Sequence, residues 1–286
     1  PGDAAAIAAI ADIVRGSTIC SLARCNEKDI DAAWNSIRRA ENARIHTFLA
    51  TSPVHMQYKL KMTPDEVVES VAHNVAYAKK YCDDIEFSAE DACRSDLDFL
   101  CRVFETAIKA GATTINIPDT VGYMIPEEYA ARIRYLREHT PGIENIVLSC
   151  HMHNDLGMAV ANSLAGVEAG IDQIECTING IGERAGNASM EECVMALKTR
   201  ADIFGIACSI DTTQIYRASR MIQTITGVSV APTKPIVGAN AFAHEAGIHQ
   251  HGVMENKETY EIMTPESVGN RAGQAFRPPC VRGAAA

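Results

Sequence analysis

The chain has 286 residues, of which 47% are hydrophobic and 22% charged, and its formal net charge is -10. This is the composition of an ordinary globular protein, and its acidic balance disfavours a nucleic-acid partner, which normally requires a basic surface. The apolar runs are far shorter than the roughly 20 residues that cross a bilayer, so we expect no membrane partner. The 10 cysteines contain no CxxC pair, which indicates reduced thiols and a cytoplasmic protein.

Apolar runs alternate with amphipathic stretches along most of the chain. After an opening helix that ends by Gly16, we expect strands at residues 19–23, 45–50, 85–88, 114–117, 146–150 and 173–178. We expect helices at residues 27–40, 64–81, 96–110, 126–139, 156–169 and 190–201. A repeat of about 30 to 35 residues is typical of βα units in a barrel or in a doubly wound parallel sheet.

This count of elements predicts the domain organisation. An eight-stranded (β/α)8 barrel would lack its first two strands and its first helix in this chain, whose first residue is Pro1 and not Met. Beyond Phe204 the alternation stops, and one clear helix follows at residues 212–226. We therefore predict an incomplete TIM barrel at residues 1–204, a small helical subdomain at residues 205–270 and an irregular tail at residues 271–286.

The sharpest local signal is the sequence Ser149-Cys-His-Met-His-Asn-Asp155 at the end of an expected strand. Residues i and i+2 of a strand point to the same side, so His151 and His153 would present two imidazoles together. In a barrel, that strand end lies at the active-site mouth, and a pair of imidazoles completed by oxygen ligands commonly binds a catalytic metal ion. The alternative is a hydrogen-bonded surface pair.

The next strand is followed by the glycine-rich stretch Asn179-Gly-Ile-Gly-Glu-Arg-Ala-Gly-Asn187. Gly180, Gly182 and Ala185 fit a relaxed dinucleotide-binding fingerprint. That interpretation also requires an acidic strand tip about 20 residues later, where we expect a helix instead. We favour a loop that brings polar side chains to the mouth, with Asn187 able to offer an oxygen ligand.

Other expected strands also end in polar side chains. Ser88 and Glu90 would share one face of a strand, Asn116 and Thr120 follow another, and His46 lies within a third. One acidic turn or one strand histidine is usually structural, but the recurrence at successive strand ends favours a common site. His249 and His251 lie in the expected subdomain, where no strand is expected and the same-side argument does not apply.

Several longer stretches match a known family. These stretches are IHTFLATSP, DIEFSAEDACR, GATTINIPDTVGY, HMHNDLGMAVANSLAGVEAG, NGIGERAGNASMEE, GANAFAHEAGIHQHGV and YEIMTPESVG. Over about residues 1 to 270 the chain resembles the isopropylmalate synthases, within the metal-dependent Claisen-condensing family that also contains homocitrate and citramalate synthases.

The resemblance implies a (β/α)8 barrel with a following subdomain, and condensation of acetyl-CoA with 2-oxoisovalerate in leucine biosynthesis. It implies Mn²⁺ or Mg²⁺ as cofactor, bound by His151 and His153 with Asn187 as a further ligand. It implies a 2-oxoacid pocket whose residues would be His46, Ser88, Asn116 and Thr120. His249 and Tyr260 would be catalytic residues of the subdomain, reaching the partner's barrel in a homodimer.

The sequence leaves some of these expectations open. The proton of the acetyl group could be taken by Glu90, or by His249 with Tyr260. Homocitrate or citramalate synthase, or a non-catalytic fragment of such an enzyme, remain alternatives. Three features of the family are not found in these residues. They are its first strand, which supplies an Asp ligand and an Arg, its C-terminal regulatory domain, and an Asp at position 251, where this chain has His251.

Overall fold

The structure, a computed structural model, describes residues 2–270; the predicted irregular tail at 271–286 lies outside the described residues. The described residues form two compact units, one of residues 2–175 and 184–187 and the other of residues 176–183 and 188–270. We call them the sheet unit and the helical unit. The domain boundary that the sequence suggests at residue 204 stays a prediction.

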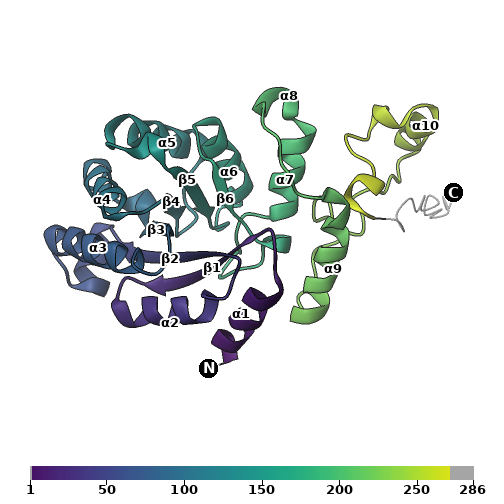
Figure 1. Cartoon of the computed structure of the whole chain (residues 1–286). Helices are drawn as coiled ribbons and strands as arrows, with labels where there is room; N and C mark the ends of the chain where they lie inside the picture. Colours follow the sequence, from purple (N-terminus) through teal and green to yellow (C-terminus); the bar gives the residue numbers. More distant parts are fainter. Residues whose placement is uncertain (1, 271–286) are drawn as a thin grey trace. The chain divides into compact units, whose positions relative to one another are not determined.

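The sheet unit contains one six-stranded sheet, whose strands are all parallel and neighbour each other in chain order. Its strands are β1 (Thr18–Arg24), β2 (Asn42–Ala50), β3 (Asp84–Glu90), β4 (Thr114–Asp119), β5 (Val147–Met152) and β6 (Gln173–Glu175). Figure 1 shows this sheet curled into part of a barrel, with helices along its outer side. The predicted α/β class and the count of six strands are confirmed.

The helices of the sheet unit follow the strands in alternation. They are α1 (Gly2–Ile13), α2 (Glu27–Ile37), α3 (Pro64–Ala78), α4 (Leu97–Ala110), α5 (Pro126–His139) and α6 (Ala159–Glu168). Local sequence explains their ends. Thr63 and Glu66 form a reciprocal capping box at the start of α3, Asp96 caps α4, and Gly111 ends α4 in the left-handed conformation.

The core of the sheet unit lies between the sheet and these helices. Ile115 and Ile117 of β4 are fully buried, and Asn116 between them lines a cleft on the other face of the sheet. This alternation follows from the two-residue period of a strand. Tyr129 of α5 is fully buried, and its hydroxyl donates a hydrogen bond to the carbonyl of Ile117 at 2.8 Å. Strand β4 therefore offers apolar side chains to the helices and the polar side chain of Asn116 to the cleft.

Some expected boundaries were wrong. Strand β6 ends at Glu175, and not at Ile178, because Thr177 instead makes an isolated bridge to Ser189 and Asn179 adopts a left-handed conformation. The periodicity of the sequence did not predict the π-helical segment His55–Leu60.

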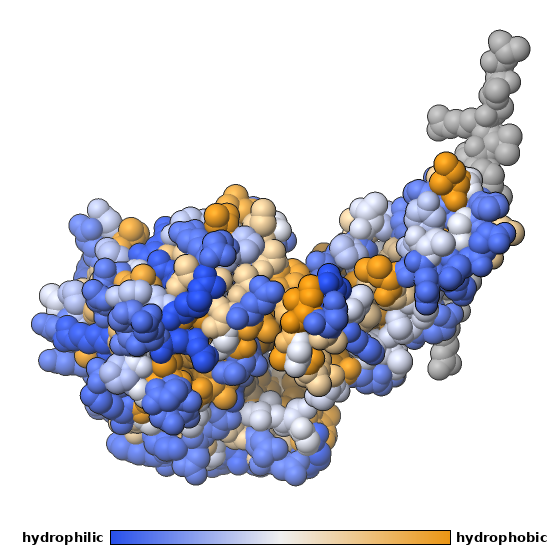
Figure 2. Space-filling model, turned by 90° about the horizontal axis from the view of Figure 1, so that it is seen from above, coloured by the Kyte–Doolittle hydropathy of each residue, from blue (hydrophilic) through white to orange (hydrophobic). Residues whose placement is uncertain are grey.

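The helical unit contains α7 (Met190–Thr199), α8 (Ala201–Phe204), α9 (Ile215–Thr226) and α10 (Gly247–Glu255). Its core is small and consists of Val194, Met195, Ile215, Val237 and Val268. Large apolar side chains of this unit remain exposed, among them Ile248, Met254 and Ile262. In Figure 2, hydrophobic residues are interspersed with hydrophilic ones over the visible face.

None of the helices within residues 2–270 combines the length and the hydrophobicity that a membrane span requires.

A close contact between α5 and α6 provides a test of the packing. A Cβ added to Gly166 of α6 would lie 2.9 Å from Cε1 of Tyr129, whose ring is fixed by its buried hydroxyl. We expect Gly166→Ala to lower the free energy of unfolding by about 1 to 2 kcal/mol, because overpacking outweighs the gain in helix propensity. Urea unfolding followed by circular dichroism measures this change.

The control is Gly2→Ala, at a helical glycine of the same unit where an added Cβ meets nothing within 4 Å. It should leave the urea midpoint unchanged or raise it slightly. Equal stability of the two variants would contradict the close packing of α5 on α6.

Candidate functional site

A cleft of about 230 Å³ lies at the carboxyl ends of the strands of the sheet unit. Predicted site residues line it, namely His46, Ser88, Glu90, Asn116, Thr120, His151 and His153. They come from β2, β3, β4 and β5 or from the residues just after them. The structure therefore brings together the predicted residues of the barrel strands, because parallel strands present their carboxyl ends at one edge. The roles of these residues stay predictions.

One wall of the cleft is a buried hydrogen-bonded network. Ser88 Oγ accepts a hydrogen bond from Asn116 Nδ2 at 2.8 Å and lies 2.6 Å from His46 Nε2. A serine hydroxyl can donate one hydrogen bond and accept two, so this contact fits either neutral tautomer of His46. Burial lowers the pKa of His46, which keeps the ring neutral.

The histidine pair follows β5 as the sequence predicts. The Nε2 atoms of His151 and His153 lie 3.3 Å apart, with the rings edge to face. Two nitrogen ligands at 2.0 to 2.1 Å from one ion are about 2.9 Å apart at a right angle and about 3.3 to 3.4 Å apart at the tetrahedral angle. The two imidazoles therefore fit a shared divalent ion. Asn187 lies beside them, since it forms an isolated bridge with His153.

Behind this pair lies a carboxylate that the sequence analysis missed. Glu175, the last residue of β6, places Oε2 3.1 Å from His151 Nδ1 and Oε1 3.7 Å from His46 Nδ1. Although burial opposes its ionisation, contact with the His151 side chain lowers the pKa of Glu175.

A second ionic network extends from Glu175 deeper into the sheet. Arg44 pairs with Asp84 at 2.9 Å and with Glu86 at 3.1 Å, and Gln173 Nε2 donates to Glu86 at 3.0 Å. Burial, together with the neighbouring Glu175 charge, raises the pKa of Glu86 to about 7.

The candidate base Glu90 has a cationic partner. Its carboxylate oxygens lie 2.6 and 2.8 Å from Lys59 Nζ, and His55 Nε2 is 3.9 Å from one of them. Lys59 lies in the π-helical segment that follows β2. This segment therefore places a positive charge beside the cleft.

The loops after β4, β5 and β6 are tied together by one arginine. Both Arg184 Nε and Nη2 lie 2.9 Å from the carboxylate of Asp155, and Nη2 also donates to the carbonyl of Thr120 at 2.8 Å. Thr120 Oγ1 in turn accepts a hydrogen bond from the backbone of Asp91. These contacts fix the rim of the cleft where Thr120 lies.

The other two predicted catalytic residues belong to the helical unit. The rings of His249, in α10, and Tyr260 lie 4.3 Å apart between centroids. His244 is 6.2 Å from Tyr260. These two residues therefore lie next to each other, and their catalytic role stays a prediction.

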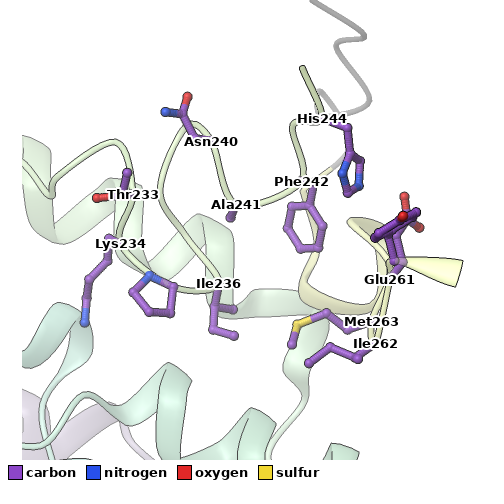
Figure 3. Close-up of a pocket in the computed structure, with 12 residues that line it drawn as sticks. Thr233, Lys234, Ile236, Asn240, Ala241, Phe242, His244, Glu261, Ile262 and Met263 are labelled. Atoms are coloured by element: carbon purple, nitrogen blue, oxygen red, sulfur yellow. The ribbon is translucent and has the colours of Figure 1, made fainter. Parts of the chain in front are cut away.

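A second cavity of about 480 Å³ lies within the helical unit and includes Tyr260. Figure 3 shows its two sides, a loop that carries Phe242 and His244 and a segment that carries Ile262 and Met263. Lys234 of the loop extends to Glu192 of α7 and to Ser189.

The dinucleotide interpretation of the glycine-rich stretch gains no support. The following helix, α7, begins at Met190, after the whole stretch, and Gly180 ends a short 3-10 turn. A dinucleotide fingerprint requires the glycines to open directly onto a helix N-terminus, which would bind the pyrophosphate.

Comparisons with known proteins define the family to which the chain belongs. The profile of the family described as HMGL-like matches residues 1–222, and that described as homocitrate synthase post-HMGL domain-like matches residues 236–277. The chain belongs to the HMGL-like family. Its fold resembles that of the solved hydroxymethylglutaryl-CoA lyase from Pseudomonas aeruginosa, with a TM-score of 0.66 and 22% identity over 80% of this chain and 76% of that one.

Within that class, the chain is similar to curated 2-isopropylmalate synthases. It is 61% identical to that of Dechloromonas aromatica over 94% of this chain and 52% of the relative, and 61% identical to that of Thiobacillus denitrificans over 96% and 54%. The chain thus spans about half the length of the curated relatives it matches. The family resemblance stated from the sequence is confirmed.

The Arg184 contacts give a test of the cleft's rim. Arg184→Lys removes the two-point pairing with Asp155, so the loop around Thr120 should open more often. Because the ion pair is partly exposed, we expect the free energy of loop opening to fall by only about 1 kcal/mol. Hydrogen exchange of the peptide that contains residues 120–124 should become faster.

The matched control is Arg200→Lys, because Arg200 pairs with Asp202 through the same atoms but only within its own segment. It should leave exchange at residues 120–124 unchanged. Unaltered exchange in Arg184→Lys would contradict the role assigned to Arg184.

Proposed function

We propose that the protein containing this chain condenses acetyl-CoA with 2-oxoisovalerate and water to give 2-isopropylmalate and CoA. The observation that carries this proposal is the 61% identity, over 94% of the chain, to a curated 2-isopropylmalate synthase. The cleft adds a chemical reason, because it joins two convergent imidazoles to a polar wall suited to a small 2-oxoacid.

A divalent ion, Mn²⁺ or Mg²⁺, fits this site. His151 and His153 would hold it through their Nε2 atoms, and Asn187 would supply a further or water-mediated oxygen ligand. When bound there, the ion would act as a Lewis acid towards the 2-oxo and carboxylate oxygens of the substrate. The spacing of the two nitrogens supports this assignment.

The 2-oxoacid would bind against the buried wall. Ser88 and Asn116 present a hydroxyl and an amide that are already ordered by His46, so little side-chain entropy is lost when the substrate binds. Thr120 would complete the pocket at the rim, where Arg184 fixes its backbone.

Removal of a proton from the acetyl group requires a base near the thioester. Glu90 is one candidate, because its side chain lines the cleft. The neighbouring pair of His249 and Tyr260 is the other candidate, and in that case a homodimer would bring the pair to the partner's sheet unit.

Homocitrate synthase is the second candidate within the same class. It is favoured by the match of residues 236–277 to the domain that follows the HMGL-like region in homocitrate synthases. The two candidates, together with citramalate synthase, differ only in the 2-oxoacid that is accepted.

The test is release of the CoA thiol by the full-length protein. We expect release from acetyl-CoA only with 2-oxoisovalerate and Mn²⁺ or Mg²⁺, and much less with pyruvate or 2-oxoglutarate. His151→Ala should lower the rate by at least about 100-fold, since it removes a metal ligand. His139→Ala, at an exposed histidine of α5, should not.

Undiminished turnover in excess chelator would contradict a metal-dependent reaction. A higher specificity constant for 2-oxoglutarate than for 2-oxoisovalerate would instead indicate that the protein makes homocitrate.

A further inference from the structure

Glu175 lies between two histidines with different predicted roles. One carboxylate oxygen faces Nδ1 of His151, a predicted metal ligand, at 3.1 Å, and the other faces Nδ1 of His46, in the predicted substrate pocket, at 3.7 Å. Its side chain is 26% exposed. This position at the end of β6 puts one carboxylate beside both imidazoles, at hydrogen-bond distance from that of His151.

A network of polar and ionic groups lies behind Glu175. Arg44 Nη1 and Gln173 Nε2 donate to the two oxygens of Glu86 at 3.1 and 3.0 Å. Glu175 Oε2 lies 3.1 Å from Nδ1 of His151, which is close enough to accept a proton from that nitrogen in a hydrogen bond.

We propose that Glu175 is a positioning residue that holds His151 with its proton on Nδ1, so that the Nε2 lone pair is directed towards the ion. A carboxylate that accepts the distal N–H of a histidine ligand fixes the tautomer and raises the basicity of the other nitrogen. The part of this inference that concerns metal affinity rests on the proposed metal-dependent function.

The other oxygen of the same carboxylate faces His46. It lies 3.7 Å from Nδ1 of His46, which is too far for a hydrogen bond, so it acts on this ring only through its charge. The 2.6 Å contact of His46 Nε2 with Ser88 Oγ fits either tautomer. Glu175 is therefore a positioning residue for His151 and not for His46.

The experiment compares Glu175→Gln, Glu175→Asp and Glu86→Gln in the 286-residue chain. Glutamine matches glutamate in size but has no charge and can donate as well as accept. Glu86→Gln is the matched control, because it changes a neighbouring buried carboxyl group that lies on Arg44 and Gln173. Thermal unfolding of each variant separates positioning from loss of fold.

The first readout is the tautomer of His151 without metal, from long-range proton–nitrogen NMR of histidine-labelled protein at a pH where the rings are neutral. His151→Ala assigns its signals. We expect the Nδ1–H form in the wild-type chain and in Glu86→Gln, and a mixture of both forms in Glu175→Gln. An unchanged His151 spectrum in Glu175→Gln would overturn the proposal.

The second readout is Mn²⁺ affinity by calorimetry. Glu175→Gln should weaken binding by about 10- to 100-fold, and Glu175→Asp should recover part of that loss. Equal weakening by Glu86→Gln would overturn the proposal, because it would show a general effect of charge or packing. If the wild-type chain binds no Mn²⁺ while the tautomer still changes only in Glu175→Gln, the metal assignment fails and the positioning role stands.

Discussion

The parallel direction of all six strands is the constraint on which the rest of the sheet unit depends. Because every strand runs the same way and neighbours follow chain order, all carboxyl ends meet along one edge. Imidazole, hydroxyl, amide and carboxylate groups from distant parts of the chain are thereby brought into one cleft. The apolar alternate residues of the same strands pack beneath the helices, so folding and the arrangement of the cleft have a common cause.

Burial gives these polar groups defined protonation states. Burial lowers the pKa of His46 and keeps it neutral, and its Nε2 shares a hydrogen bond with Ser88 Oγ, which also accepts from Asn116 Nδ2. Deeper in the sheet, Arg44 offsets the buried negative charge around Glu86. An uncompensated buried charge would destabilise the fold by several kcal/mol, so the ionic network contributes both to stability and to the state of Glu175 at the edge of the cleft.

The period of the apolar pattern predicted the fold class, the strand count and most of the helices, since a strand or helix buried on one face carries that period in its sequence. The same rule for strand ends placed His151, Ser88 and Asn116 in one site. Glu175 was missed because the sequence extends β6 past it, to Ile178. The Arg44 network could not be predicted, because it joins residues far apart in the chain whose pairing depends on strand register.

The central claim is that His151 and His153 bind one divalent ion at the carboxyl edge of the sheet. Pulsed electron paramagnetic resonance of Mn²⁺ added to the chain tests it directly, because imidazole nitrogens bound to Mn²⁺ produce a measurable hyperfine coupling. We predict coupling from two imidazole nitrogens in the wild-type chain and from one in His153→Ala. Bound Mn²⁺ without any nitrogen coupling would contradict the account.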